Sequence, residues 1–223
     1  TIKDFQESFT NELEDSVISY STKAFSNPYV LKILNDNGMN IDVVTGGELA
    51  VAKYVKFPPE KINFHGNNKS LEELKEAINY GLGHITIDSF NEIENLRKIT
   101  LESSIIQNVM IRVSPSIDPH THLLTTTGIL DSKFGFSIET GDAEKAIEKL
   151  MKIKSLNLLG LHFHLGSPIF ELKPYSEAID YVFQFAAEMR NKYGLDMKEF
   201  SPGGGFALGY QTQKKPLPIS DYA

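Results

Sequence analysis

The chain has 223 residues, of which 41% are hydrophobic and 23% charged, a balance typical of a globular protein with one core. A net charge of −7 without a basic stripe argues against a nucleic-acid-binding surface, and no run reaches the roughly 18 apolar residues of a membrane span. The absence of cysteine excludes disulfides, thiolate metal sites and cysteine nucleophiles. With no signal-peptide pattern at residues 1–5, these features favour a cytoplasmic location.

Hydrophobic periodicity predicts an alternation of helices and strands along the chain. Helices are expected at residues 1–13, 28–36, 48–56, 70–80, 91–101, 142–154 and 175–193, with another beginning near Asp221. Strands are expected at residues 17–20, 41–44, 61–64, 84–87, 108–113, 158–164 and 198–201. Ser70 and Glu73 form a capping-box pattern at the start of the fourth helix. The polar segment 114–135 is expected to be a functional loop or disordered.

Seven strands that alternate with helices predict one α/β domain over residues 1–223, with a parallel sheet. Residues that could take part in catalysis or ligand binding follow nearly every predicted strand, which is typical of the rim of a barrel. A doubly wound sheet would gather them at one crevice. We therefore expect a (β/α)8 TIM-type barrel. Because only seven βα units can be counted, the chain looks like an incomplete barrel.

Lys23 directly follows the first predicted strand. A lysine at the carboxyl end of a barrel strand can act as a nucleophilic amine and form a Schiff base with a carbonyl compound. Asp42, near the end of the second strand, could pair with a cation or orient a neighbouring side chain. Arg112 lies within an apolar strand and must satisfy its charge, either in a structural ion pair or on a ligand.

Three consecutive glycines, Gly203, Gly204 and Gly205, follow the last predicted strand. Bare backbone lets amide N–H groups approach an anion, and barrels commonly bind phosphate in the loops after strands seven and eight. Ser167 follows the sixth strand, where its hydroxyl and amide could reach the same phosphate. The alternative is a tight turn without a ligand.

His162 and His164 are two residues apart on a predicted strand, so their side chains are expected to share a face. They could be packed in the core or bind a metal, or one ring could stack on a planar cofactor. A metal needs at least three protein ligands, and no third ligand is apparent beside this pair, so we expect no metal site. An amine, a stacking ring and a phosphate-binding loop are together what pyridoxal 5′-phosphate requires.

Several motifs in this chain resemble those of the fold-type III pyridoxal-phosphate-dependent decarboxylases, and among these the diaminopimelate decarboxylases most closely. They are Tyr20-Ser-Thr-Lys-Ala24, Asp42-Val-Val-Thr-Gly-Gly-Glu-Leu49, His65-Gly-Asn-Asn-Lys-Ser70, Thr127-Gly128, Asp131-Ser-Lys-Phe-Gly135, Gly160-Leu-His-Phe-His-Leu-Gly-Ser167 and Gly203-Gly-Gly-Phe206. They occur in the family's order over nearly the whole chain. The motifs at 65–70 and 131–135 favour diaminopimelate over ornithine or arginine as the substrate.

The resemblance implies that the cofactor is held by Lys23, Asp42, Arg112, His164, Ser167, Gly203, Gly204 and Gly205. Lys23 would hold it as an internal aldimine, His164 would stack on its ring, and Ser167 with the glycines would bind its phosphate. The implied reaction is the decarboxylation of meso-2,6-diaminopimelate to L-lysine, a step of lysine biosynthesis. The implied partners are this small amino-acid substrate and a second copy of the full-length protein, without nucleic acid or membrane.

Members of this family are longer, because a β-domain that supplies further active-site residues follows the barrel. The resemblance therefore implies that this chain is a fragment of the barrel and is inactive alone. The alternatives are a single-domain carrier of pyridoxal phosphate, a related decarboxylase or racemase with another amino-acid substrate, and a non-catalytic structural barrel.

Overall fold

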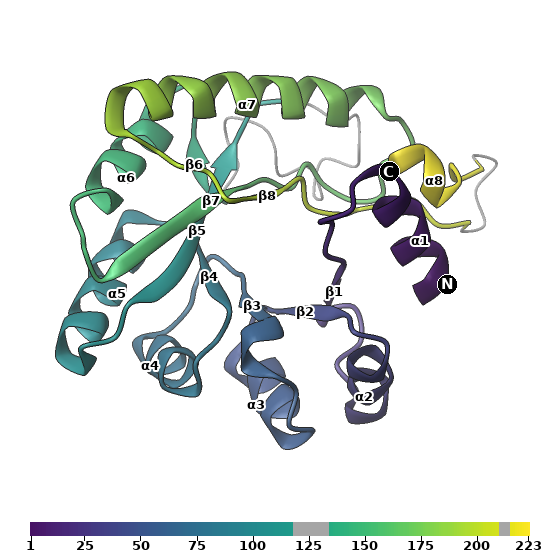
Figure 1. The fold of residues 1–223 in the computed structure, drawn as a ribbon, viewed down its shortest axis with the longest axis horizontal. Helices are drawn as coiled ribbons and strands as arrows, with labels where there is room; N and C mark the ends of the chain where they lie inside the picture. The colour runs from purple at the N-terminus through teal and green to yellow at the C-terminus, as the bar shows by residue number, and fades with distance from the viewer. Residues whose placement is uncertain (118–133, 210–214) are drawn as a thin grey trace. The chain divides into compact units, whose positions relative to one another are not determined.

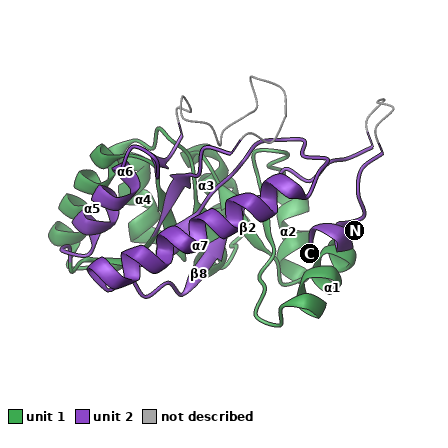
Figure 2. Cartoon of the chain, turned by 90° about the horizontal axis from the view of Figure 1, so that it is seen from above, with its two compact units in different colours: residues 1–109, 154–157 green, residues 110–153, 158–223 purple. Residues whose placement is uncertain are grey.

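The computed structural model describes residues 1–117, 134–209 and 215–223 (Figure 1). The described chain divides into two compact units (Figure 2). The first unit comprises residues 1–109 and 154–157, and the second comprises residues 110–153 and 158–223. Most of the predicted loop 114–135, including the motif residues at 127–128 and 131–133, lies outside the described residues. The expectation of one domain over 1–223 stays a prediction.

The first unit is an alternation of helices with short parallel strands. Its elements are α1 (Ile2–Glu12), β1 (Ser19–Ser21), α2 (Pro28–Asp36), β2 (Asn40–Val43), α3 (Gly46–Tyr54), a 3-10 turn (Pro59–Lys61), β3 (Ile62–Phe64), α4 (Leu71–Tyr80), β4 (His84–Ile87) and α5 (Phe90–Ser103). Each strand from β1 to β4 pairs in parallel with the next. Figure 1 shows α2, α3 and α4 along the outer side of β2, β3 and β4.

Local sequence explains where these helices begin. The hydroxyls of Thr45, Ser70 and Ser89 each accept a hydrogen bond from an amide in the first turn of α3, α4 and α5, as preferred N-cap residues do. Glu73 completes the predicted capping box of α4 with Ser70. All residues of β3 and β4 are buried, as expected of parallel strands covered on both faces.

The second unit contains the carboxyl-terminal strands and the longest helix. Its elements are β6 (Phe136–Ser137), α6 (Asp142–Leu150), α7 (Lys173–Tyr193), β8 (Glu199–Ser201) and α8 (Ile219–Tyr222), together with most of β5 (Gln107–Ser114) and β7 (Leu156–His162), which begin in the first unit. β6 pairs in parallel with β5, and β8 with β7. A Cβ built on Gly160 of β7 would overlap the carbonyl oxygen of Glu199, its register partner on β8. Glycine at this position therefore lets the two strands pair.

The order of the strands in the sheet is β1-β2-β3-β4-β5-β7-β8, which is their order in the chain, with β6 beside β5. This order is that of a (β/α)8 barrel, whereas a doubly wound sheet reverses direction at a switch point. The prediction of an α/β fold of the barrel type, with about seven strands in sequence, is confirmed.

Several details of the sequence prediction are wrong. β1 covers 19–21 instead of 17–20, and α6 ends at Leu150 instead of residue 154. The two-residue strand β6 was not expected, and β7 covers 156–162 instead of 158–164. His164 therefore lies two residues beyond the end of β7, in the following loop, and does not share a strand face with His162.

Candidate active site

Lys23 lies exposed in the turn that immediately follows β1, as the sequence predicts. The residue before it, Thr22, is fully buried and anchors this turn. The amide and the hydroxyl of Thr22 each donate to the backbone oxygen of Asp42 at 2.9 Å, and the hydroxyl also donates to the carboxylate of Glu48. The backbone at Lys23 is thus fixed while its amine stays accessible, which suits a nucleophilic lysine.

Asp42 connects three strands of the first unit through its carboxylate. Its Oδ1 accepts hydrogen bonds from Ser19 Oγ on β1 at 2.5 Å and from Asn63 Nδ2 on β3 at 3.0 Å. The same oxygen lies 3.7 Å from His65 Nε2. Of the two roles predicted for Asp42, this arrangement favours the orientation of neighbouring side chains.

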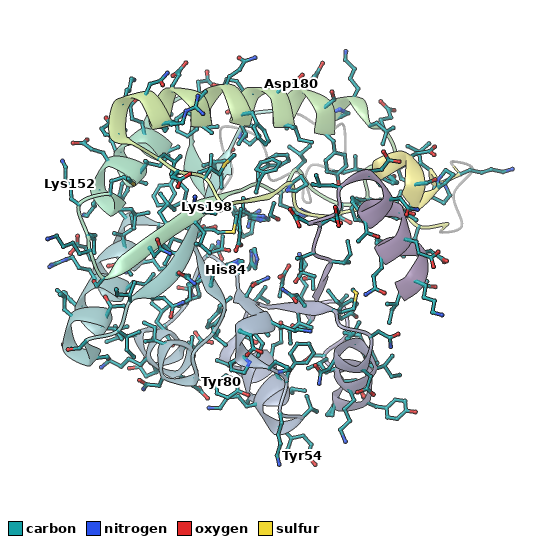
Figure 3. All side chains as sticks on the ribbon, viewed as in Figure 1. Tyr54, Tyr80, His84, Lys152, Asp180 and Lys198 are labelled. Carbon is teal, nitrogen blue, oxygen red and sulfur yellow. The ribbon has the colours of Figure 1, made fainter. Side chains whose placement is uncertain are left out.

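His84 on β4 belongs to the same polar group. Its ring packs edge-on against that of His65, with centroids 6.3 Å apart, and it is 9% exposed. Figure 3 shows His84 at the strands, whereas Tyr54 and Tyr80 lie on the outer helices. Burial and, to a smaller extent, the charge of His65 lower the pKa of His84, Asp42 opposes both effects, and the resulting pKa is about 4. His84 is therefore neutral at pH 7.

A buried ion pair joins the loop after β3 to α5. Lys69 Nζ lies 2.8 Å from Glu92 Oε1, and the two side chains are 1% and 6% exposed. Lys69 also donates to the carbonyl oxygens of Gly66 and Thr86 at 2.5 and 2.9 Å. Burial raises the pKa of Glu92, and the attraction of Lys69 opposes this shift. Sequence reasoning noted the motif that contains Lys69 but assigned no role to it.

In the second unit, the glycine run (Gly203, Gly204 and Gly205) lies against the ring of His164. A Cβ built on Gly203 would stand 3.0 Å from His164 Nδ1, and one on Gly205 would stand 3.4 Å from Cε1 of the same ring. Gly203 and Gly205 have φ values of +74° and +96°, which favour glycine. The structure therefore brings together the ring and the glycine run that the sequence singled out.

The amides of the glycine run are available to an anion. Within the described residues, no protein group accepts a hydrogen bond from the amides of Gly204 or Gly205, and a Cβ on Gly204 would meet nothing within 4 Å. Alternating backbone conformations with open amides make an anion-binding nest. Ser167 lies exposed on the loop whose Gly166 oxygen contacts Gly205 and whose Ile169 amide donates to the Gly205 oxygen at 2.8 Å.

Arg112 is half-buried on β5, with its guanidinium carbon 4.5 Å from the centroid of the Phe134 ring. Arginine over an aromatic face is a favourable cation–π arrangement. Phe134 belongs to the motif at 131–135, so this contact ties Arg112 to the segment that follows the loop.

Two residues that sequence reasoning did not assign hold the glycine run in place. Ser201 Oγ accepts from the Gly203 amide at 3.4 Å and lies 3.0 Å from Nδ1 of the buried His162. Tyr175 donates to the Gly204 oxygen at 2.5 Å. Ser201 could have been suspected from its place just before the glycines, whereas Tyr175 reads as an ordinary core residue of a helix.

The residues present fit pyridoxal phosphate. In the second unit, a planar imidazole beside a nest of open amides and a nearby serine could supply a stacking surface and a phosphate site. In the first unit, Lys23 could supply an amine as the attachment point. In the described ranges, no three histidine, aspartate or glutamate side chains gather in a way that could hold a metal ion. None of the helices in these ranges has the length and apolarity needed to cross a membrane.

Comparison with known proteins identifies the family. The family model described as "Pyridoxal-dependent decarboxylase, pyridoxal binding domain" matches residues 1–223. The chain belongs to this family. The match confirms the resemblance noted in the sequence and the predicted cofactor, because this domain is the pyridoxal-binding part of the decarboxylases.

The curated relatives of this pyridoxal-binding domain include diaminopimelate decarboxylases. That of Bacillus subtilis is 38% identical over 220 residues, which are 99% of this chain and 50% of that protein. That of Mycobacterium tuberculosis is 38% identical over 210 residues, 92% of this chain and 47% of that protein. The chain thus spans about half the length of the curated relatives it matches.

Solved structures of diaminopimelate decarboxylases share the fold of this pyridoxal-binding domain. The Helicobacter pylori enzyme complexed with L-lysine has a TM-score of 0.88 at 29% identity, over 99% of this chain and 56% of that chain. The M. jannaschii enzyme in co-complex with L-lysine has a TM-score of 0.89 at 30% identity, over 99% of this chain and 51% of that chain.

Proposed function

We propose that the full-length protein to which this pyridoxal-binding domain belongs decarboxylates meso-2,6-diaminopimelate to L-lysine with pyridoxal phosphate. The observation that carries the proposal is the ring of His164 lying against a glycine run with open amides, because it combines a stacking face with an anion nest. The substrate is supported by relatives that are diaminopimelate decarboxylases and by two solved relatives that bind L-lysine, the product of this reaction.

The site residues then have the following roles. Lys23 would attach the cofactor through its Nζ, and His164 would stack on its ring. Ser167, Gly203, Gly204 and Gly205 would bind the phosphate through a hydroxyl and backbone amides. Asp42 orients the polar side chains of Ser19 on β1 and Asn63 on β3, and Arg112 would lie near the cofactor.

When bound, pyridoxal phosphate supplies an electron sink for the electron pair left by the departing carboxylate. The carboxylate of the substrate leaves as carbon dioxide, and a proton takes its place on the same carbon. The chain's own contribution is to hold and orient the reactants, which lowers the entropy cost of the step. A homodimer of the complete protein, a cytoplasmic location and the absence of nucleic-acid and membrane partners are part of the same proposal.

Reduction with borohydride tests the attachment point. After incubation with pyridoxal phosphate and reduction, peptide mass spectrometry should find the phosphopyridoxyl group on the peptide that contains Lys23. Lys23→Ala should abolish this modification and, in the full-length protein, lower lysine formation from meso-diaminopimelate by about 10³-fold or more. Lys75→Ala, which removes another exposed lysine of the first unit, is the matched control and should change neither result.

Modification of another lysine, or full activity of Lys23→Ala, would refute the assignment of Lys23. The substrate is tested with the same protein by offering ornithine and arginine in place of diaminopimelate. Faster release of carbon dioxide from either would refute diaminopimelate as the substrate.

A further inference from the structure

The second peptide of the glycine run is held from one side by Tyr175. This residue lies in the first turn of α7 and is 8% exposed, and its hydroxyl donates to the oxygen of Gly204 at 2.5 Å. Its ring packs against those of Phe206 and Tyr222, with centroids 6.3 and 6.2 Å away. The phenol is therefore fixed both by its neighbours and by its hydrogen bond.

This hydrogen bond fixes the direction of the next amide. In a planar trans peptide, the C=O of one residue and the N–H of the next point in opposite directions. Because the Gly204 oxygen faces Tyr175, the Gly205 N–H points away from Tyr175. Among the described residues no protein group accepts from this amide, so it is free to bind a ligand.

The peptide that follows is fixed as well. The Ile169 amide donates to the Gly205 oxygen at 2.8 Å, and Gly205 itself adopts a φ of +96°. A bound anion would otherwise have to stop the glycines from rotating, at an entropy cost that glycine makes larger than any other residue. In this protein the hydrogen bonds from Tyr175 and Ile169 already restrict these peptides in the folded state, so ligand binding loses less entropy.

The hydroxyl of Tyr175 retains its proton over the working pH range. Burial raises the pKa of the phenol far above its ordinary value, and the nearby Tyr222 raises it further. Tyr175 thus remains a hydrogen-bond donor to the Gly204 oxygen.

We propose that Tyr175 is a positioning residue that aims the Gly205 amide at the phosphate of the cofactor. Through this amide it sets the preference of the protein for pyridoxal phosphate over unphosphorylated pyridoxal. The inference rests on the proposed role of the glycine run as the phosphate site.

The test is the ratio of two affinities, measured by spectroscopic titration of the purified protein with pyridoxal phosphate and with pyridoxal. Tyr175→Phe keeps the ring and removes only the donor. It should weaken pyridoxal phosphate binding by about tenfold, since a hydrogen bond to a charged group is lost or misdirected. Binding of pyridoxal should change by less than about twofold, because this ligand has no phosphate for the amide to contact.

Tyr222→Phe is the matched control. It removes another hydroxyl of the same aromatic cluster, one that donates to the Ile169 oxygen at 2.6 Å and accepts from the Ala207 amide at 3.5 Å. Among the described residues this hydroxyl forms no hydrogen bond with the glycine run. The affinity ratio should stay at its original value. An equal fall of the ratio in this control would overturn the inference, since general loosening of the cluster would then explain the result.

A second measurement uses the unsubstituted protein and does not depend on the folding of a variant. The backbone amide resonance of Gly205 should shift on addition of pyridoxal phosphate, and should shift much less with pyridoxal. An unresponsive Gly205 amide would overturn the inference.

The outcomes also separate this inference from the proposed function. If the unsubstituted protein binds both ligands equally well, the glycine run is not a phosphate site and both proposals fail. If it prefers pyridoxal phosphate and Tyr175→Phe keeps the full preference, only the role of Tyr175 is refuted.

Discussion

The polar groups of the first unit and those of the second are built in different ways. In the first unit they are charged or titratable side chains that lie close to one another, such as the buried pair of Lys69 with Glu92 and the half-buried Asp42 with His65. In the second unit the central feature is a run of glycines, and side chains such as Tyr175 and Ser201 serve to hold its backbone.

This difference predicts different sensitivities. Buried charges depend on pH and on the presence of each partner, because an unpaired charge in a low dielectric is costly. A backbone nest depends on shape, because its donors are amides that do not titrate and its conformation excludes most side chains. The stability of the first unit should therefore be most sensitive to substitutions that change a buried charge. That of the second unit should be most sensitive to substitutions that add a side chain to a glycine.

The largest effect is expected from Lys69→Met, which leaves the buried carboxylate of Glu92 without its partner. The free energy of unfolding, measured by urea denaturation, should fall by about 3–5 kcal/mol. Lys152→Met is the control, since Lys152 is 71% exposed and pairs with Glu148 on the surface. Its loss should cost less than about 1 kcal/mol. Equal losses in the two variants would show that the buried ion pair contributes no more to the free energy of unfolding than a surface pair does.

A smaller effect concerns the pH dependence of stability through His84. Its pKa is about 4 in the folded protein, against about 6.5 for a histidine in the unfolded chain. Between these values the unfolded chain binds a proton that the folded protein does not, so the free energy of unfolding falls as the pH drops from 6.5 to 4. The contribution of His84 to this fall is about 3 kcal/mol, at 1.36 kcal/mol for each pKa unit.

His84→Gln should remove that contribution. Urea denaturation at several pH values between 4 and 6.5 should give a shallower decline for the variant, and above pH 7 the two proteins should show the same dependence on pH. A decline as steep in His84→Gln as in the unsubstituted protein would mean that other groups cause it.

The smallest effect is expected in the glycine run and depends on where an atom is added. Gly205→Ala places a methyl group against the Gly166 oxygen at a φ of +96°, and should lower the free energy of unfolding by about 1–3 kcal/mol. Gly204→Ala adds the same group where no atom lies within 4 Å, and should change it by less than about 0.5 kcal/mol. Similar losses of unfolding free energy in the two variants would contradict the idea that backbone shape decides the sensitivity of the glycine run.

Much of the fold could be predicted because local pattern and final structure agree. The capping box of Ser70 and Glu73 marked the start of α4, and β4 has the predicted bounds of 84–87. The predicted sixth strand ran on to His164 because apolar residues continue to alternate there. In the structure the loop beyond β7 instead packs against the glycine run, a tertiary contact that periodicity does not encode. The two residues of β6 are too few to show a period.

In the candidate site, too, some residues could be proposed from the sequence and others could not. Lys23, His164 and the glycines stand at positions where their residue types suggest chemistry, so they could be proposed from the sequence. Tyr175 lies 29 residues from Gly204 in the chain, and its hydrogen bond arises only from the packing of α7. Likewise, nothing in the predicted amphipathic helix around Glu92 indicated that this carboxylate would be buried against Lys69.

The missing side chain of Gly160 has a consequence for the evolution of this protein. Any substitution there would push Glu199 away and disturb the pairing that carries on to His162 and Ser201. Selection should remove substitutions at this position because they disturb strand pairing, so a survey of natural variants should find Gly160 as invariant as Lys23, the proposed attachment point.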